Sequence, residues 1–520
     1  MFIDARQISE GAVIEADVFV VGAGAAGITL ALDLADGARR IAVAESGGFE
    51  FSQETQQLYD GDVIGVPFPP LTIDRLRYLG GSTNHWSGSC RPFDAIDFER
   101  RDYVANSGWP FGRDELDPFY PRAHELCQLG PYTYNPLKWR TADAQPLDFG
   151  SDAALYTGIY QNGPPTRFGE AYRRDLATAR NLSVYLNANL VDIETDESGT
   201  EVTGLALACF HGPRLRAHAK LYILACGAIE NARLLLNANR VQSAGLGNRY
   251  DLVGRYFMDH PRFADAATIL LADDVSGLAM YDGFTVNGQA IQGYLCPTAA
   301  VQRREALPNC CIILQRGELP EHDLARASLA SLWKAVKSGY LPDHLFYHVG
   351  QVFRGVEFKV ERTYDRWLHA ASSLYSTTFM CECPPDRDSR VTLGNATDAL
   401  GLRRVRLDWR LPPDIGRYLH RAHELLAQEL GRHGLGRLSI NMREEDAAGA
   451  ALNGHHHMGT TRMHPDPKLG VVDANCRVHG MANLFVAGSS IFPAYSFDDP
   501  TMTIVALALR LSRHLKTATG

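Results

Sequence analysis

The feature that most constrains this chain is a strand–turn–helix segment near its start. Residues 17–21 are mostly apolar, Gly22-x-Gly24-x-x-Gly27 follows directly, and residues 28–34 continue as an apolar, helix-like stretch. In such a turn the first glycine permits the tight bend, the second lets a phosphate approach the backbone, and the third allows close helix–strand packing. The free N–H groups and the dipole of the helix N-terminus favour negative charge there. The segment therefore predicts a pyrophosphate-binding turn.

The acid that completes this pattern lies at the end of the next strand. Residues 41–44 are apolar and are followed by Glu45. This acid is about 20 residues beyond Gly22, where dinucleotide-binding folds place a carboxylate that accepts a hydrogen bond from a ribose 2′-OH. Together these elements predict an α/β fold with a dinucleotide site. The alternative is a glycine-rich turn in some other α/β protein.

Composition limits the remaining interpretations. The chain has 520 residues, which predicts two domains, and its net charge of −9 argues against nucleic acid or an anionic membrane surface as a partner. The sequence shows no apolar run of membrane-spanning length and no signal-peptide pattern. Ten scattered cysteines without a Cys-x-x-Cys pair are typical of small core residues in a reducing compartment, so we expect a cytoplasmic protein.

The middle of the chain contains two different patterns. A helix is expected over 114–127. Strands are expected over 184–186, 190–194, 202–210 and 221–225, and a second strand-to-helix turn follows Ala225. This second turn indicates a cofactor domain assembled from separated segments.

Residues 261–449 have β-type runs, such as 267–271 and 391–393, that predict a larger, mainly antiparallel sheet. An aromatic-rich helical stretch at about 322–368 interrupts them, and we interpret it as an insertion that forms either a subunit contact or a substrate lid. The predicted cofactor domain thus comprises residues 1–260 and 450–520, and the predicted substrate domain residues 261–449.

Two further segments combine residues that carry chemistry. The segment 80–88 mixes glycines, small hydroxyls, an asparagine, a histidine and a tryptophan, so it can lie flat against a planar ligand. Near the C-terminus, His455-His456-His457 precede a strand at 484–490, and Asp499-Pro500 then opens a final apolar helix. Acid followed by proline is a strong helix start.

These motifs resemble, in order along the chain, those of the glucose–methanol–choline (GMC) oxidoreductases, flavoproteins that oxidise alcohols with FAD. Within that family, residues 82–86 are most similar to the sugar-oxidising, pyranose-oxidase-like branch. The resemblance implies a Rossmann-type FAD-binding domain and a substrate domain with a large, mainly antiparallel sheet and helices. The matching segments are 22–27 with Glu45, 80–88, 224–233, His456-x-x-Gly459-Thr460 and 499–504.

The resemblance also implies which residues bind FAD. Gly22, Gly24, Gly27 and Glu45 would hold the ADP half, with Val191 by the adenine and Ala225 at the second turn. The loop residues Gly81, Ser82, Asn84 and His85 would follow the isoalloxazine edge. Gly488 and Ser489 would lie along the ribityl chain, and Pro500 and Thr501 would direct the last helix's dipole at the flavin N1 region. In the pyranose-oxidase-like branch the position of His85 can carry a covalent bond to the flavin; the alternative is a histidine packed against the ring.

Two residues are candidates for catalysis. His456 matches the family's catalytic histidine, and an imidazole can take the hydroxyl proton while hydride leaves for flavin N5. Three consecutive histidines do not easily converge on one ion, so no metal is expected. Asp499 stands where the family usually has Asn or His. It is predicted either to cap the final helix or to act as a carboxylate beside His456, which would raise the histidine pKa and attract a cationic substrate.

The expected function is therefore FAD-dependent oxidation of an alcohol group in a sugar, glycoside, amino sugar or other polyol. Oxygen or another acceptor would take the electrons, and a homo-oligomer is left open. The alternative is a GMC-type flavoprotein with different chemistry, such as a lyase or a light-driven decarboxylase.

Overall fold

The first of two main sheets is parallel and is built from strands that lie far apart in the sequence. The computed structural model describes residues 1–35, 37–164, 166–272, 275, 277–316 and 374–518. Its two central strands bury every residue, as their unbroken apolar sequences predict. In sheet order the strands are β1 (Phe2–Asp4), β8 (Leu182–Leu186), β4 (Ile41–Ala44), β3 (Val18–Val21), β12 (Leu221–Leu224) and β23 (Leu484–Val486).

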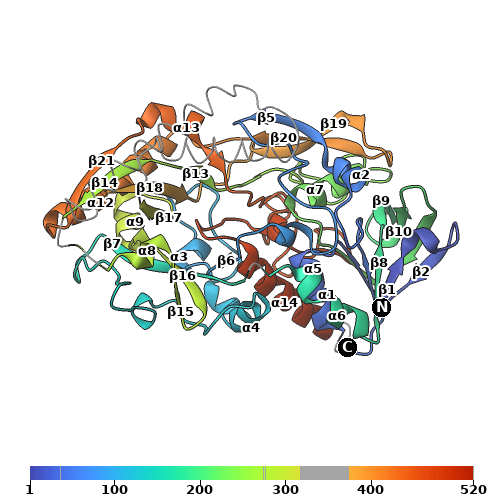
Figure 1. Cartoon of the computed structure of the whole chain (residues 1–520). Helices are drawn as coiled ribbons and strands as arrows, with labels where there is room; N and C mark the ends of the chain where they lie inside the picture. Colours follow the sequence, from blue (N-terminus) through green and yellow to red (C-terminus); the bar gives the residue numbers. More distant parts are fainter. Residues whose placement is uncertain (36, 165, 273–274, 276, 317–373, 519–520) are drawn as a thin grey trace, which may run out of the picture.

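The first and last long helices of this half pack together. Helix α1 (Ala25–Leu34) follows the glycine turn, and α14 (Thr501–Ala518) lies beside it. Ser512 donates a hydrogen bond to Asp33 at 2.6 Å across this contact. The two chain ends therefore belong to the same region, on the right in Figure 1.

The second main sheet has ten strands and is antiparallel. It occupies the left half of Figure 1. Its main path runs through β21 (Gly436–Ile440), β14 (Ala267–Leu271), β18 (Leu374–Cys381), β17 (Cys310–Arg316), β16 (Gln289–Pro297), β7 (Leu155–Asn162) and β6 (Ser89–Cys90). The short strands β13 (Pro261–Phe263), β22 (Leu452–Asn453) and β15 (Phe284–Val286) pair at its margins.

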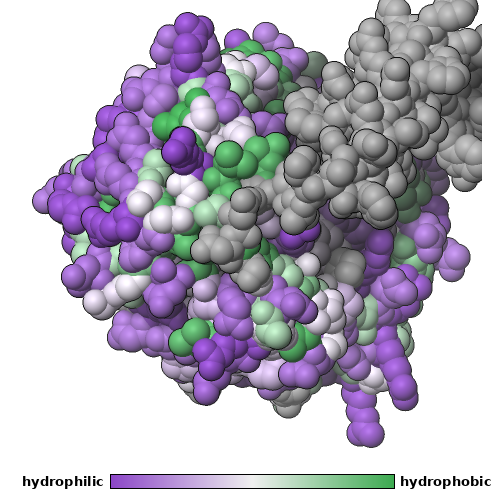
Figure 2. Space-filling view, turned by 60° about the vertical axis from the view of Figure 1, so that its left-hand side comes forward, coloured by the Kyte–Doolittle hydropathy of each residue, from purple (hydrophilic) through white to green (hydrophobic). Residues whose placement is uncertain are grey.

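One face of this sheet carries the amphipathic helix α12 (Ile415–Arg432). Thr377 of β18 hydrogen-bonds His423 of that helix at 2.9 Å. Because side chains alternate along a strand, Thr378 and Met380 point to the opposite face, which borders the cavity described below. On the side of the molecule shown in Figure 2, hydrophilic residues dominate the periphery and hydrophobic residues gather near the centre.

Two smaller sheets complete the described architecture. One contains β2 (Val13–Glu15), β11 (Arg214–His218), β10 (Val202–Ala208) and β9 (Asn189–Thr195). The other contains β19 (Arg390–Thr397), β20 (Arg403–Trp409) and β5 (Gly61–Gly65). None of the helices in the described ranges combines the length and apolar character needed to cross a membrane.

The predicted α/β class with a large antiparallel sheet is confirmed, with some differences in detail. The helix expected over 114–127 is wrong at its start: a 3₁₀ turn ends at Glu115, and α4 (Tyr120–Leu126) begins only after Pro118. Proline disfavours helical geometry in the residue before it, which accounts for the break. The strand β11 was not anticipated.

The domain boundaries remain a prediction, although β6 and β7 precede residue 260 and yet belong to the ten-stranded sheet. The predicted insertion at 322–368 lies outside the described residues.

Candidate active site

A cavity of about 680 Å³ lies where the carboxyl ends of the parallel strands face the ten-stranded sheet. Ligands in open α/β sheets bind at this edge. Most of the predicted site residues line this one cavity, namely Gly22, Gly24, Glu45, Gly81, Ser82, His85, Ala225, His456, Gly488, Ser489, Asp499, Pro500 and Thr501.

Three predicted residues are not among those that line the cavity. Gly27 packs beneath the turn. Asn84 is buried and donates to the carbonyl of Leu79 at 3.0 Å, so it shapes its loop from within. Val191 does not line the cavity although the adjacent Leu190 does, as expected for neighbours on a strand.

The glycine turn has the geometry that its sequence predicts. Gly22 adopts a φ of 100°, in the left-handed region. A Cβ on Gly27 would lie 1.9 Å from the carbonyl oxygen of Gly22, so this position requires close backbone packing. A Cβ on Gly24, by contrast, would have no neighbour within 4 Å. The turn thus leaves open space at the N-terminus of α1, where a phosphate would be favoured.

Glu45 is held against this turn from both sides. One carboxylate oxygen accepts from the N–H of Ala23 and the other from the N–H of Gly47, both at 2.9 Å. Oε1 also accepts from the hydroxyl of Ser46 at 3.4 Å, whereas Oε2 keeps a second lone pair for a ligand. The carboxylate is thereby fixed at the cavity wall, where it can accept from a ribose hydroxyl.

The second strand-to-helix turn contains two residues that sequence reasoning missed. Asn231 accepts from the N–H of Cys226 at 2.9 Å and donates to Ser490 at 2.9 Å, which joins the ends of β12 and β23. The buried Glu230 pairs with Arg75 and Arg77, which precede the loop 80–88, and with Arg233. These contacts tie that loop to the parallel sheet.

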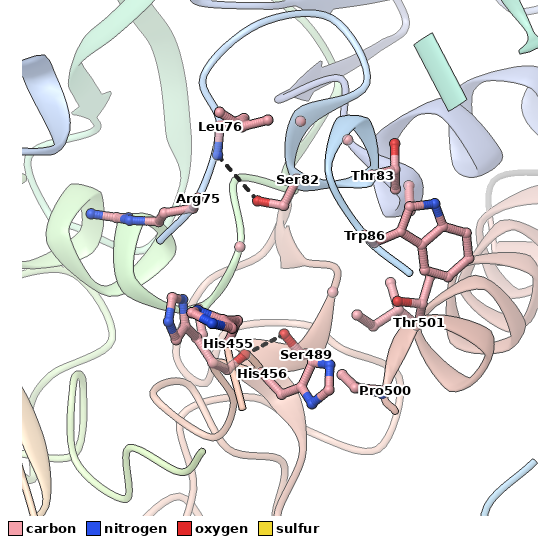
Figure 3. A pocket seen from close by; sticks show the side chains of 18 of the residues that line it. Arg75, Leu76, Ser82, Thr83, Trp86, His455, His456, Ser489, Pro500 and Thr501 are labelled. Carbon is pink, nitrogen blue, oxygen red and sulfur yellow. Dashed lines mark hydrogen bonds between the residues drawn. The ribbon is translucent and has the colours of Figure 1, made fainter. Parts of the chain in front are cut away.

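Two of the three consecutive histidines turn toward one carboxylate, and the middle one does not. His455 and His457 both contact the buried carboxylate of Asp74, another residue missed from sequence. Although burial opposes ionisation of Asp74, the charges and hydrogen bonds of these two histidines hold its pKa well below the usual range. The ring of His456 lies apart from them, beside Pro500 (Figure 3). Asp74 therefore holds the outer histidines while the middle one faces the cavity.

A chain of hydrogen bonds fixes the orientation of His456. Its Nδ1 lies 2.7 Å from Nδ1 of His260, and Nε2 of His260 lies 2.5 Å from the carbonyl oxygen of Ser496. A carbonyl only accepts, so Nε2 of His260 carries a proton. Burial, followed by the neighbouring charge of His456, lowers the pKa of His260 well below its usual value, which keeps the ring neutral. The Nδ1 of His260 must then accept, and His456 must donate from its own Nδ1.

This tautomer leaves Nε2 of His456 unprotonated. Asp259 also holds the backbone of both histidines in place, because its carboxylate accepts from the N–H groups of His456 at 2.8 Å and His260 at 2.7 Å. In the sequence the pair is marked only by Asp259-His260, an acid followed by a histidine directly before Pro261.

Asp499 lies 3.5 Å from Nε2 of His456 through Oδ1. Burial raises the pKa of Asp499 to about 7, although the charge of Arg262 partly offsets this. Burial and the charges of His457 and His455 lower the pKa of His456 to about 3. The histidine is thus a free base at neutral pH and its pKa is not raised as the carboxylate interpretation expected. Among the described residues, no N–H group of α14 donates a hydrogen bond to the Asp499 carboxylate. The hydrogen bonds therefore give no support to the capping alternative.

The chain is similar in sequence to several known proteins. Residues 385–508 match the family model described as GMC oxidoreductase. The chain is 24% identical to 6'''-hydroxyparomomycin C oxidase of Streptomyces lividus, over 96% of this chain and 90% of that protein. It is 23% identical to the fructose dehydrogenase large subunit of Gluconobacter japonicus, over 96% of this chain and 97% of that protein.

The C-terminal part of this chain, residues 385–508, is that of a GMC oxidoreductase. The fold of the whole chain is similar to that of a formate oxidase from Aspergillus oryzae in which FAD modification was studied. The TM-score is 0.56 at 16% identity, covering 98% of this chain and 99% of the other.

The cavity of this chain has features that suit an FAD molecule. The open N-terminus of α1 suits a pyrophosphate, and the fixed carboxylate of Glu45 suits a ribose. Pro500 and Thr501 also line the cavity and place the start of the 18-residue helix α14 there, and its dipole favours negative charge at that point.

Proposed function

We propose that this oxidoreductase binds FAD and oxidises a CH–OH group of a sugar, glycoside, amino sugar or other polyol to a carbonyl. The observation that carries the proposal is the unprotonated Nε2 of His456 at the wall of the cavity, beside the helix start at Pro500. The two relatives described above bear the names of an aminoglycoside oxidase and a sugar dehydrogenase, which supports a hydroxylated substrate.

The FAD would be held along the predicted residues. Gly22, Gly24 and the first turn of α1 would receive the pyrophosphate, and Glu45 the ribose. Gly81 to His85, Gly488, Ser489 and the start of α14 would surround the flavin. When bound, FAD accepts a hydride at N5.

The chain's own residues supply the proton chemistry. His456 Nε2 accepts the hydroxyl proton as the substrate's C–H bond gives up its hydride, so the alcohol loses two electrons and two hydrogens and becomes a carbonyl. Before the proton transfer, His260 and the Ser496 carbonyl keep His456 in the tautomer whose Nε2 is unprotonated. An ionised Asp499 at 3.5 Å stabilises the imidazolium that forms.

His85 lines the same cavity and is the residue through which a covalent flavin link would form. Precipitation of the yellow protein with acid separates the two cases, because a covalent flavin stays with the pellet. His85→Ala should release the colour to the supernatant if the link exists.

The function is tested by anaerobic mixing of the purified holoenzyme with a panel of sugars, polyols, amino sugars and simple alcohols. The proposal expects loss of the oxidised flavin absorption with at least one polyhydroxylated compound. A protein that holds FAD but is not reduced by any compound of the panel would contradict it.

A further inference from the structure

One of the arginines that line the cavity differs from the others in its partners. Arg262 is the middle residue of β13, and it lines the cavity together with Arg75 and Arg77. Arg75 and Arg77 both pair with the buried Glu230. Arg262, by contrast, makes no hydrogen bond or ion pair with any residue that the structure describes. Its positive charge is therefore left without a described counter-ion.

The alternation of side chains along β13 directs Arg262 toward the cavity. The next residue, Phe263, is buried on the other face of the sheet, where its ring centre lies 6.0 Å from that of Phe379. Phe379 in turn lies 5.8 Å from the ring of His423 on α12. Arg262 stands directly opposite Met380 in the antiparallel register, and Met380 lines the cavity. Because consecutive side chains point to opposite faces, Arg262 shares the cavity face with Met380 and not the face that α12 covers.

The charge of Arg262 acts on both residues that carry the proposed proton chemistry. Burial raises the pKa of Asp499 to about 7, and the charge of Arg262 opposes this rise. Burial and neighbouring charges, those of His457, His455 and Arg262 among them, lower the pKa of His456 to about 3. A guanidinium stays charged at neutral pH, whereas Asp499 is then only partly ionised and His456 is neutral. The permanent charge beside the reacting groups is therefore positive.

We propose that Arg262 binds an anionic group of the hydroxylated substrate, a carboxylate or a phosphate, and thereby selects sugar acids and similar polyhydroxylated anions. This inference rests on the proposed function and narrows its substrate class. A guanidinium suits both anions, because it can donate two parallel hydrogen bonds to a pair of their oxygens. The preference is opposite to the cationic substrate that an ionised Asp499 would attract, since a cation would meet the charge of Arg262.

Ligands of matched shape isolate the effect of charge. D-Glucuronate and D-galacturonate are each compared with their neutral amides, D-glucosamine supplies a cation, and D-glucose 6-phosphate supplies a phosphate. Anaerobic calorimetry of the holoenzyme gives Kd for each compound, and stopped-flow absorbance gives flavin reduction. We expect at least one acid to bind roughly 10-fold more tightly than its amide, which is the scale of a hydrogen bond to a charged group.

Four variants test whether Arg262 is the source of that preference. Arg262→Gln should remove the roughly 10-fold difference between acid and amide, and Arg262→Lys should keep most of it because the charge remains. Arg262→Glu should reverse it, so that D-glucosamine binds more tightly than the acid. The control Arg437→Gln removes an equal charge from an exposed position of β21 in the same sheet, outside the cavity lining. It should change the acid-to-amide ratio by less than about 2-fold, because distant exposed charges are screened.

A double variant separates a direct contact from an effect through Asp499. In the Asp499→Asn background no carboxyl remains to be ionised at that position, and Arg262→Gln should still remove the preference for the acid. A preference that depends on Asp499, or that Arg437→Gln removes equally, would overturn the contact.

The remaining outcomes distinguish this inference from the proposed function. An acid and a phosphate that bind no more tightly than the neutral compounds to wild type would overturn the anion site. A preference confined to D-glucose 6-phosphate would support the site and identify phosphate as its ligand. Binding of the anion without flavin reduction would contradict the proposed function but leave the anion site standing. Flavin reduction by neutral sugars, with a Kd that Arg262→Gln leaves unchanged for every anion, would do the reverse.

Discussion

The imidazole rings of His260 and His456 meet nitrogen to nitrogen, with their Nδ1 atoms 2.7 Å apart. Only one of the two nitrogens can carry the shared proton. The Ser496 carbonyl decides which, because it accepts from the far side of His260. The tautomer of His456 is thus determined by Ser496, which is linked to it through His260 by two successive hydrogen bonds.

Replacing His260 with Ala should slow flavin reduction by roughly 10- to 100-fold, by analogy with the loss of a residue that orients a metal-bound histidine. Without its acceptor, His456 no longer prefers the tautomer with a free Nε2. His260→Asn restores an acceptor near the Nδ1 position and should recover part of the rate. Stopped-flow reduction of both variants checks this, and equal rates for Ala and Asn would contradict the tautomer argument.

Replacing His456 with Ala should slow flavin reduction by roughly 10²- to 10⁴-fold, the range for a lost general base. The flavin content should stay unchanged, because the residue is assigned to chemistry and not to binding. His464→Ala, on the same C-terminal segment but outside the cavity lining, is the matched control. A near-normal rate in His456→Ala would remove this residue from the mechanism.

The pH profile of flavin reduction should report Asp499 rather than His456. With a pKa of about 3, His456 is already a free base, whereas Asp499 ionises near pH 7 and then stabilises the imidazolium. The rate should therefore rise through neutral pH in wild type, and Asp499→Asn should abolish that rise. A rise that persists in the Asn variant would assign it to another group.

Replacing Arg262 with Gln should move the same rise to higher pH. The guanidinium favours the ionised form of Asp499, so its removal raises the pKa of that carboxyl above about 7. Arg262→Lys keeps the charge and should leave the profile nearly in place. If the pH profiles of the Gln and Lys variants shift by the same amount, the shift is not caused by the loss of charge at residue 262.

Replacing Asp74 with Asn should lower the free energy of unfolding by about 1–3 kcal/mol. This value lies between those for exposed and for fully buried ion pairs, because His455 is 59% exposed and Asp74 is buried. The pKa of Asp74 is lowered from 3.8, so its contribution exists above about pH 4 and is lost in acid. The pKa of His455 is raised from 6.5 by its hydrogen bond to Asp74, so that contribution is present below 6.5 and is lost as pH rises further.

The difference in Tm between wild type and Asp74→Asn should therefore be largest between about pH 4 and 6.5. Asp62→Asn, at an exposed position of β5, is the control and should show no such window. A constant difference across pH would mean that Asp74 acts through packing alone.

Local patterns in the sequence predicted the parts of the site that depend on local structure. The turn at Gly22, the strand before it and the acid at Glu45 lie within one supersecondary unit, so spacing alone indicates their arrangement. His456 came from a resemblance and lies at the cavity wall. Asp74 and His260 were not predicted because their roles arise from contacts across long stretches of chain, such as His455 with Asp74. Hydrophobic periodicity and secondary-structure propensity depend on residues close together in the sequence, so neither indicates such contacts.

The parallel sheet has a consequence for how the chain is made. Strand β12 leaves the ribosome long before its neighbour β23, and α1 long before α14, which covers it. At usual synthesis rates the wait is on the order of 10–50 s for β12 and 20–90 s for α1. Throughout that interval the nascent chain carries an unpaired strand edge and an uncovered apolar helix surface, both prone to aggregation. The C-terminal segment that brings Pro500 and Thr501 to the cavity is therefore also the one that ends this exposure.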